Sequence, residues 1–190
     1  MRPHGTAGTP PPQPPPPRPR TPPHTTVILI DGPSGSGKTA LAERMRADWV
    51  GRPPTVVHLD DIYPGWDGLE AASRQITEQL LEPLRGGGEP RWRRHDWVAD
   101  APAEWHGVDR AHPLIIEGCG ALSRRNAALA DFTIWVEAGD IERKRRALDR
   151  DGELYAREWD RWEAQWQRFV AREDPRGAAK LIVSTETPGR

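Results

Sequence analysis

The chain has 190 residues, of which 36% are hydrophobic, and a formal net charge of −1. This length suits a single domain with a full core, and no apolar run approaches the roughly 20 residues that span a bilayer. The charge excludes a general nucleic-acid binder, which needs a basic surface excess. The single cysteine, Cys119, cannot form an internal disulfide, and no apolar segment follows Arg2 as in a secretory signal. We therefore expect a cytoplasmic protein that binds neither membranes nor nucleic acid.

Residues 1–24 differ in composition from the rest of the chain. They hold 11 of the 21 prolines and three arginines without an acid, so residues 25–190 carry 24 basic against 28 acidic side chains, a net charge of −4. Such a segment has almost no apolar side chains to bury, and we expect a disordered or polyproline-like tail ahead of one domain at 25–190. A partner with a proline-binding groove could dock there, but a solvated tail is the simpler interpretation.

The motif that organises the domain is GPSGSGKT at residues 32–39. An apolar run at 27–30 precedes it and a helix-forming stretch at 40–45 follows, which predicts a strand, a phosphate-binding loop and a helix. Glycines let successive backbone N–H groups converge on phosphate oxygens, Lys38 supplies charge for the β- and γ-phosphates, and Thr39 offers a hydroxyl to Mg²⁺. A chance Gly/Ser-rich linker is the alternative, and the flanking strand and helix argue against it. The residues expected to bind ATP are Gly32, Ser34, Gly35, Ser36, Gly37, Lys38 and Thr39.

Acidic residues end two further apolar runs. Asp60 and Asp61 follow the run 55–59, and Glu117 closes the run 114–117. The carboxyl ends of parallel strands lie at the sheet edge where ligands bind. One carboxylate of the Asp pair could act as a base for a substrate hydroxyl and the other could support Mg²⁺, as could Glu117 beside the loop. Helix capping or a turn is the alternative for each acid.

Periodicity predicts the remaining elements. Apolar residues recur every three or four positions over 68–84, which indicates a helix, and further helices are expected at 121–130, 140–151 and from 155 onward. The aromatic residues from Tyr155 to Phe169 have helical spacing and are expected to pack in the core. With strands at 132–136 and 178–184, the pattern predicts a three-layer α/β/α fold with a five-stranded parallel sheet behind the phosphate-binding loop.

The segment from Glu89 to Asp109 shows neither a helical nor a strand period and is rich in Arg, Trp and His. As an insertion in a phosphate-binding protein, it could stack on a base or bind an anionic group, so it is a candidate pocket for the acceptor substrate. A surface excursion whose tryptophans cover the core edge is the alternative. The candidate substrate-binding residues here are Arg94, His95, Asp96 and Trp97.

Residues 140–151 mix acids with arginines. Such a charge run is usually a solvated helix face, but arginines at a helix end can also neutralise charge on a moving phosphoryl group. Arg146 and Arg150 are four residues apart and share one face. Cys119, between two glycines, is expected to be a packing residue rather than a nucleophile.

Together these motifs resemble the uridine kinase-like group of P-loop kinases, which also contains nicotinamide riboside kinase, pantothenate kinase and phosphoribulokinase. The loop 32–39 matches its G-x-x-G-S-G-K-[ST] motif, residues 60–63 match its Asp-x-Phe-Tyr segment with Ile62 in place of Phe, and residues 115–118 match its strand-Glu-Gly segment. The resemblance implies a P-loop fold of the nucleoside and nucleotide kinase type. It also implies that Asp60 is the base facing the acceptor hydroxyl, and that Asp60 and Tyr63 bind the acceptor substrate. The segment His95-Asp96-Trp97 departs from the Tyr-Asp-Phe of uridine kinases.

The sequence therefore predicts an ATP-dependent kinase that transfers the γ-phosphate to a hydroxyl of a nucleoside or another small molecule. Mg²⁺ would be held by Thr39, Glu117 and Asp61. The expected catalytic residues are Lys38, Asp60, Arg146 and Arg150.

Two other functions stay open. One is a regulatory or binding NTPase that hydrolyses ATP slowly or not at all. The other is a nucleoside monophosphate kinase, whose acceptor phosphate would need Arg91, Arg93 and Arg94. The sequence indicates neither the acceptor nor the oligomeric state.

Overall fold

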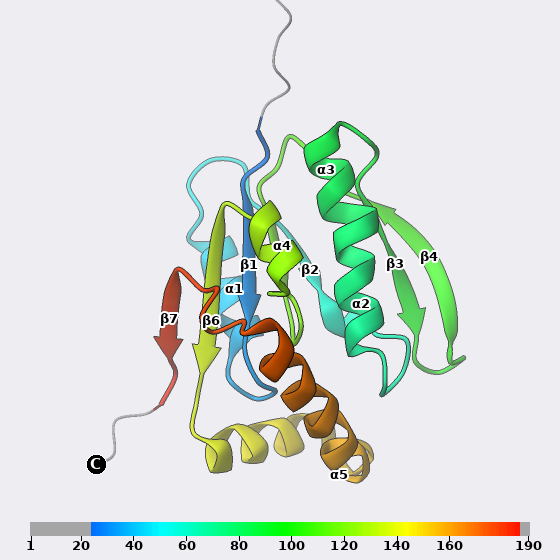
Figure 1. Cartoon of the computed structure of the whole chain (residues 1–190), viewed down its shortest axis with the longest axis vertical. Helices are drawn as coiled ribbons and strands as arrows, with labels where there is room; N and C mark the ends of the chain where they lie inside the picture. The colour runs from blue at the N-terminus through cyan, green and yellow to red at the C-terminus, as the bar shows by residue number, and fades with distance from the viewer. Residues whose placement is uncertain (1–23, 187–190) are drawn as a thin grey trace, which may run out of the picture.

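The computed structural model describes residues 24–186, so the tail predicted at 1–24 lies outside the described residues except for His24. Its main sheet has five strands: β1 (Val27–Asp31), β2 (Thr55–His58), β5 (Leu114–Glu117), β6 (Phe132–Glu137) and β7 (Leu181–Ser184). The strand order is β2-β5-β1-β6-β7 and every neighbouring pair is parallel (Figure 1). The predicted five-stranded parallel sheet is confirmed.

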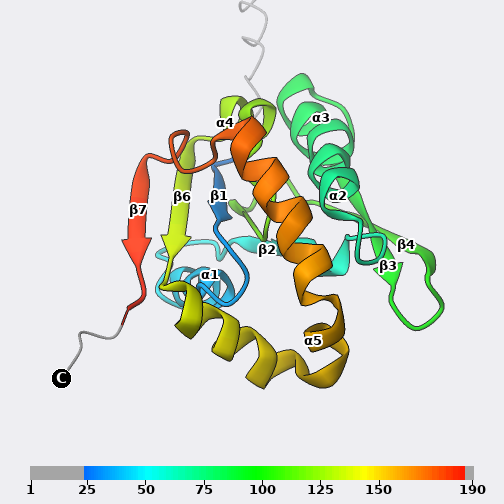
Figure 2. The ribbon, with the colours of Figure 1, turned by 60° about the horizontal axis from the view of Figure 1, so that its bottom comes forward.

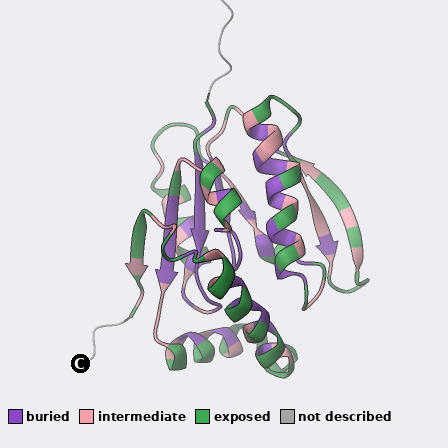
Figure 3. Ribbon diagram, viewed as in Figure 1, coloured by how far each residue is buried: buried purple, intermediate pink, exposed green. Residues whose placement is uncertain are grey.

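Helices cover both faces of this sheet, as a parallel sheet requires. Helix α1 (Lys38–Ala47) packs on one face against Ile28 and Ile30 of β1, while Val27 and Leu29 point to the opposite face. That second face is covered by α2 (Leu69–Gln75), a π-helical segment (Ile76–Leu81), α3 (Glu82–Gly86), α4 (Arg124–Leu129) and the second half of α5 (Asp140–Glu173) (Figures 1 and 2). All five residues of β1 are therefore buried (Figure 3), and the three-layer α/β/α prediction is confirmed.

The long helix α5 bends at Gly152, whose φ of 69° and ψ of −156° are not helical. This break separates the two helices that the sequence predicts around it. The first half runs past the carboxyl ends of the strands, and the second half returns over the sheet (Figure 2). The aromatic stripe of the second half is buried, as expected, at Tyr155, Trp159, Trp162, Trp166 and Phe169.

The segment 89–109 corrects the expectation that it has no regular structure. Strands β3 (Arg91–Asp96) and β4 (Ala101–Gly107) pair in an antiparallel hairpin, with an irregular register between Arg93 and His95. A search for alternating apolar residues does not detect these strands, because their alternating positions hold long amphipathic side chains. Trp92 stacks on His106 across the pair, and Arg91 lies over the ring of Trp105. Such aromatic and cation–π pairs stabilise a hairpin whose aliphatic content is low.

No helix within residues 24–186 combines the length and the apolar character needed to cross a membrane.

Packing of α5 on the sheet depends on Phe169, which is fully buried and stacks on Trp166 with ring centroids 6.0 Å apart. We expect Phe169→Ala to lower the free energy of unfolding by about 3–5 kcal/mol, because it leaves a cavity in the core. Ile141→Ala in the same helix is the control, since Ile141 is 90% exposed and its change should stay within about 0.5 kcal/mol. Urea titrations of the two variants check this, and equal losses would contradict it.

Candidate functional site

The P-loop connects the end of β1 to the start of α1. Gly35 and Gly37 have φ values of 77° and 98°, a backbone region that residues with a Cβ rarely adopt. A Cβ at Gly35 would collide with the backbone of Arg143 in α5. The loop is therefore wedged against the first half of α5, and only glycine fits at that contact.

Asp31, the last residue of β1, is fully buried beneath this loop. Its carboxylate accepts hydrogen bonds from the backbone N–H groups of Gly32 (2.6 Å), Gly120 (3.1 Å) and Leu122 (2.8 Å). Burial raises its pKa to about 6, although the N–H donors and Lys38 act in the opposite direction. Asp31 thus joins the P-loop to the segment after β5. Sequence reasoning missed it, although an acid at the end of a buried strand was the signal used for Asp60 and Glu117.

Glu117 lies at the end of β5, beside the start of α1, and is 3% exposed. Its Oε1 accepts a hydrogen bond from the Thr39 hydroxyl at 3.0 Å and lies 2.6 Å from Nδ1 of His58. Burial would raise the pKa of Glu117, but His58 and Lys38 lower it overall, and the bond to Glu117 raises the pKa of His58. The structure thus brings together two of the three predicted metal ligands and adds His58, which was not predicted.

The Lys38 ammonium points back into the loop. It donates to the carbonyl of Pro33 at 3.0 Å and lies 3.6 Å from Sγ of Cys119. The thiol in turn contacts the carbonyl of Gly32 at 3.3 Å, and burial raises its pKa. A protonated thiol packed under the loop matches the packing role expected of Cys119.

One cavity of about 550 Å³ opens beside the P-loop. Its volume is in the range of small-molecule sites. The predicted site residues that line it are Ser34, Thr39, Asp60, Asp61, Tyr63, Trp97, Glu117 and Arg150. They come from the loop, two strand ends, the hairpin and α5, so the fold gathers them from five separate segments.

Asp60 occupies a 3₁₀ turn (Leu59–Asp61) directly after β2. Asp60 lines the cavity but is otherwise surrounded by protein. Its pKa is raised, mainly because burial removes hydration and secondly because Glu117 repels its charge. The indole Nε1 of Trp97 donates to the Asp60 carbonyl at 2.9 Å. The hairpin is thereby attached to the turn that carries the predicted base.

Three predicted substrate-binding residues do not line the cavity. Arg94 is paired with Glu104 at 2.6 Å, and the Asp96 carboxylate accepts the backbone N–H groups of Val98 and Ala99, each at 3.0 Å. His95 is buried with its ring edge-on to Trp97. These contacts shape the hairpin and its turn, and Trp97 alone of the four residues 94–97 lies against the cavity.

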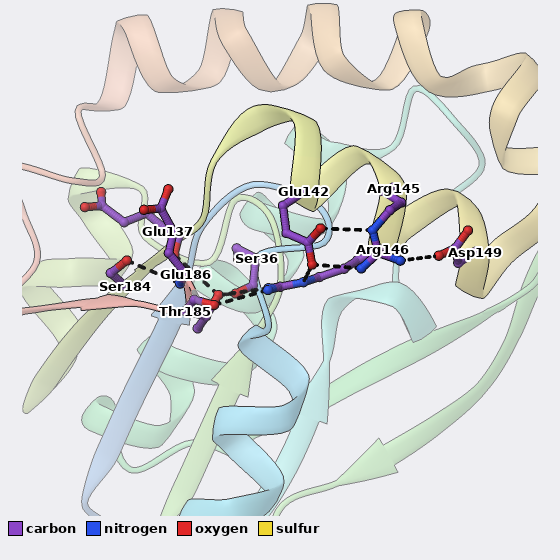
Figure 4. A network of polar contacts seen from close by, with 9 residues as sticks. All are labelled: Ser36, Glu137, Glu142, Arg145, Arg146, Asp149, Ser184, Thr185 and Glu186. Carbon is purple, nitrogen blue, oxygen red and sulfur yellow. Dashed lines mark hydrogen bonds and ion pairs between the residues drawn. The ribbon is translucent and has the colours of Figure 1, made fainter. Parts of the chain in front are cut away.

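The two arginines of the first half of α5 have different surroundings. Arg150 lines the cavity, with its guanidinium held by the Asp151 carboxylate at 2.8 and 2.7 Å. Arg146 instead donates to the hydroxyl and the carbonyl of Thr185, both at 3.1 Å, and the Thr185 hydroxyl donates to the Ser36 carbonyl at 2.7 Å (Figure 4). Arg146 is thus bound behind the P-loop, away from the lining of the cavity.

Several aromatic residues of the cavity were not predicted as site residues. Trp66, Tyr155 and Trp162 line it together with Tyr63 and Trp97. The Tyr155 hydroxyl donates to the Ser34 hydroxyl of the P-loop at 2.6 Å. The helical spacing of Tyr155 and Trp162 indicates burial correctly. This spacing does not indicate that one end of the buried aromatic stripe faces the cavity.

The residues present fit a magnesium–nucleotide complex. The Ser36 hydroxyl is buried in the loop without a hydrogen-bond partner, and the Thr39 hydroxyl with neighbouring carboxylates is an oxygen donor set of the kind that Mg²⁺ prefers. Within residues 24–186, no group of three or more His, Cys, Asp and Glu side chains could hold a metal ion alone. A Mg²⁺ ion that is also coordinated by substrate phosphates and water needs only one or two protein ligands.

No protein-family model matches the chain. A solved structure of a possible uridine kinase from Bacillus stearothermophilus is 21% identical, with a TM-score of 0.58 over 84% of this chain and 89% of that one. A candidate fructose transport system kinase from Silicibacter sp. TM1040 is also 21% identical, with a TM-score of 0.53 over 86% and 91% of the two chains. The chain therefore has the α/β fold of P-loop kinases. The resemblance to uridine kinase-like proteins is confirmed at the level of the fold.

The raised pKa of Asp31 has a consequence for stability. Between about pH 4 and pH 6 the folded chain holds a proton at Asp31 that the unfolded chain has released, so folding becomes less favourable as the pH rises through this window. Relative to Asp31→Asn, which does not titrate, the wild type should lose up to about 3 kcal/mol of unfolding free energy across it. Urea titrations of both proteins at several pH values measure this difference, and a constant difference would contradict it.

Proposed function

We propose that the chain is an ATP-dependent phosphotransferase that acts on a hydroxyl of a nucleoside or another small molecule. The main support is that one cavity joins P-loop residues to Asp60 and Arg150. A phosphoryl donor and an acceptor hydroxyl need such a shared space, because in-line transfer requires both to meet at one phosphorus.

ATP with Mg²⁺ would supply the phosphoryl group at this site. The P-loop amides and Lys38 would bind its phosphates, as they do in other proteins with the G-x-x-x-x-G-K-[ST] motif. The Thr39 hydroxyl and Glu117 would hold the metal, with Asp61 at the same end of the cavity. His58 keeps the Glu117 carboxylate oriented and ionised, which a metal ligand requires.

Asp60 would accept the proton of the acceptor hydroxyl. Its raised pKa makes it a stronger base than an exposed aspartate. Arg150, fixed by Asp151, would neutralise charge on the transferred group. Arg146, predicted for the same task, is better suited to hold the loop through Thr185.

The alternative of a nucleoside monophosphate kinase receives no support from the hairpin arginines. Arg91 and Arg93 lie over the ring of Trp105, and Arg94 is paired with Glu104. None of the three lines the cavity in the described part of the chain. An acceptor phosphate would find no guanidinium from β3 there.

Nucleotide binding is the first test. Calorimetry with MgATP should show saturable binding to the wild type, and Lys38→Ala should weaken it at least about tenfold, because a charge-assisted contact to phosphate is lost. Lys180→Ala is the matched control, since Lys180 is exposed and, among the described residues, its ammonium bonds the Asp131 carbonyl alone, at 2.7 Å. A wild type that takes up neither adenine nor guanine nucleotides would overturn the proposal.

Phosphoryl transfer is the second test, with labelled ATP and a panel of nucleosides, vitamins and sugars as acceptors. Asp60→Asn should retain nucleotide affinity and lose about 10²- to 10⁴-fold in transfer rate, the usual share of a general base. The rate of the wild type should fall on acidification at a higher pH than for an ordinary aspartate. Asp160→Asn, at an exposed position of α5, should behave as wild type. Full activity of Asp60→Asn would remove the base.

A further inference from the structure

The cavity continues past the P-loop into a space with aromatic walls. Trp66 is at the centre of these walls, stacked on Tyr155 with ring centroids 5.3 Å apart and meeting Trp97 at 5.2 Å and 60°. Trp162 lies edge-on to both Trp66 and Tyr63. Leu154 completes this lining. The space therefore accommodates a compact apolar or flat body next to Asp60.

Three polar groups of these walls are hydrogen-bonded within the protein. The Tyr63 hydroxyl donates to the Cys119 carbonyl at 2.8 Å, the Tyr155 hydroxyl to Ser34, and the Trp97 indole to the Asp60 carbonyl. The indole N–H of Trp162 is buried without a partner. A ligand is thus offered ring surfaces with few free donors, so recognition depends on shape and charge more than on hydrogen bonds.

The cavity lining carries more acidic than basic side chains. Among its described residues, the Arg150 guanidinium and the His58 imidazole, which is paired with Glu117, stand against the four carboxylates of Asp60, Asp61, Glu117 and Asp151. Arg150 is already paired with Asp151. A magnesium–triphosphate complex also carries net negative charge, so its arrival does not reverse the balance. An anionic acceptor would be repelled here, and a cationic one attracted.

We propose that the acceptor is a cationic alcohol, a small molecule with an ammonium or quaternised nitrogen on an apolar body and a hydroxyl that faces Asp60. Aromatic walls combined with carboxylates are a general means of binding such cations. The inference rests on the proposed kinase function. In the transfer, the acceptor oxygen bonds to the γ-phosphorus as its bond to the bridging oxygen of ADP breaks, and the hydroxyl proton passes to Asp60. The products are a phosphate ester and ADP.

Three compact alcohols of similar size and different charge test this: choline (positive), 3,3-dimethylbutan-1-ol (neutral) and 3-hydroxy-2,2-dimethylpropanoate (negative). Saturation-transfer NMR on the full chain, with Mg²⁺ and a non-hydrolysable ATP analogue, measures their binding. Choline should bind about fivefold or more tightly than the neutral alcohol, the effect of a cation on aromatic and acidic surroundings, and the anion should be weakest. Equal binding of choline and the neutral alcohol, or tighter binding of the anion, would overturn the inference.

Two tryptophan variants locate the binding. Trp66→Leu should remove the preference for choline, whereas Trp92→Leu should retain it, because Trp92 stacks on His106 outside the cavity. Both are partly buried, so circular dichroism confirms folding first. If Trp66→Leu does not fold, Asp61→Asn takes its place and should reduce the preference about twofold or more, since one carboxylate is lost. Unchanged preference in a folded variant would overturn the inference.

The readout separates this inference from the kinase proposal. A wild type that binds MgATP and phosphorylates neutral alcohols alone would retain the kinase and overturn the cationic acceptor. Preferential choline binding without nucleotide uptake would support the cavity chemistry and overturn the kinase.

Discussion

The buried carboxylate of Asp31 connects the two segments on which the candidate nucleotide site is built. It binds the first amide of the P-loop and two amides of the segment after β5. These bonds favour the ionised carboxylate, while complete burial disfavours it, and the balance leaves its pKa near 6. Since β1 is paired with both β5 and β6, the same residue fixes the loop relative to Glu117.

The charges at this sheet edge depend on one another. Glu117 is ionised because His58, Thr39 and Lys38 surround it, and its charge then helps to raise the pKa of Asp60. A carboxylate that holds a metal and a carboxylate that accepts a proton need such different pKa values. The two pKa values are shifted in opposite directions because Glu117 is the acid that is hydrogen-bonded, to Thr39 and His58.

The sequence predicts the parts of this arrangement that are written in short, local patterns. The P-loop, the strand-end acids and the alternation of strands and helices depend on glycine spacing and on apolar runs, so the sheet and its order of layers could be predicted. The hairpin at 91–107 could not, because Arg, Trp and His carry its alternation. Trp66 and Tyr155 were missed as cavity residues since the tertiary arrangement alone decides which end of an aromatic stripe meets an opening. Arg146 and Arg150 share a helix face, but Thr185 holds one and Asp151 the other.

The contact between Thr185 and Ser36 spans 149 positions of the chain. The Thr185 hydroxyl supports a loop carbonyl from behind, and its methyl group lies beside Gly37. Chains emerge from the ribosome starting at the N-terminus, and their domains fold as units. The contact that supports the Ser36 carbonyl can therefore form only after Thr185, which follows β7, has been synthesised, so a nascent chain that still lacks this segment has the loop sequence without that support.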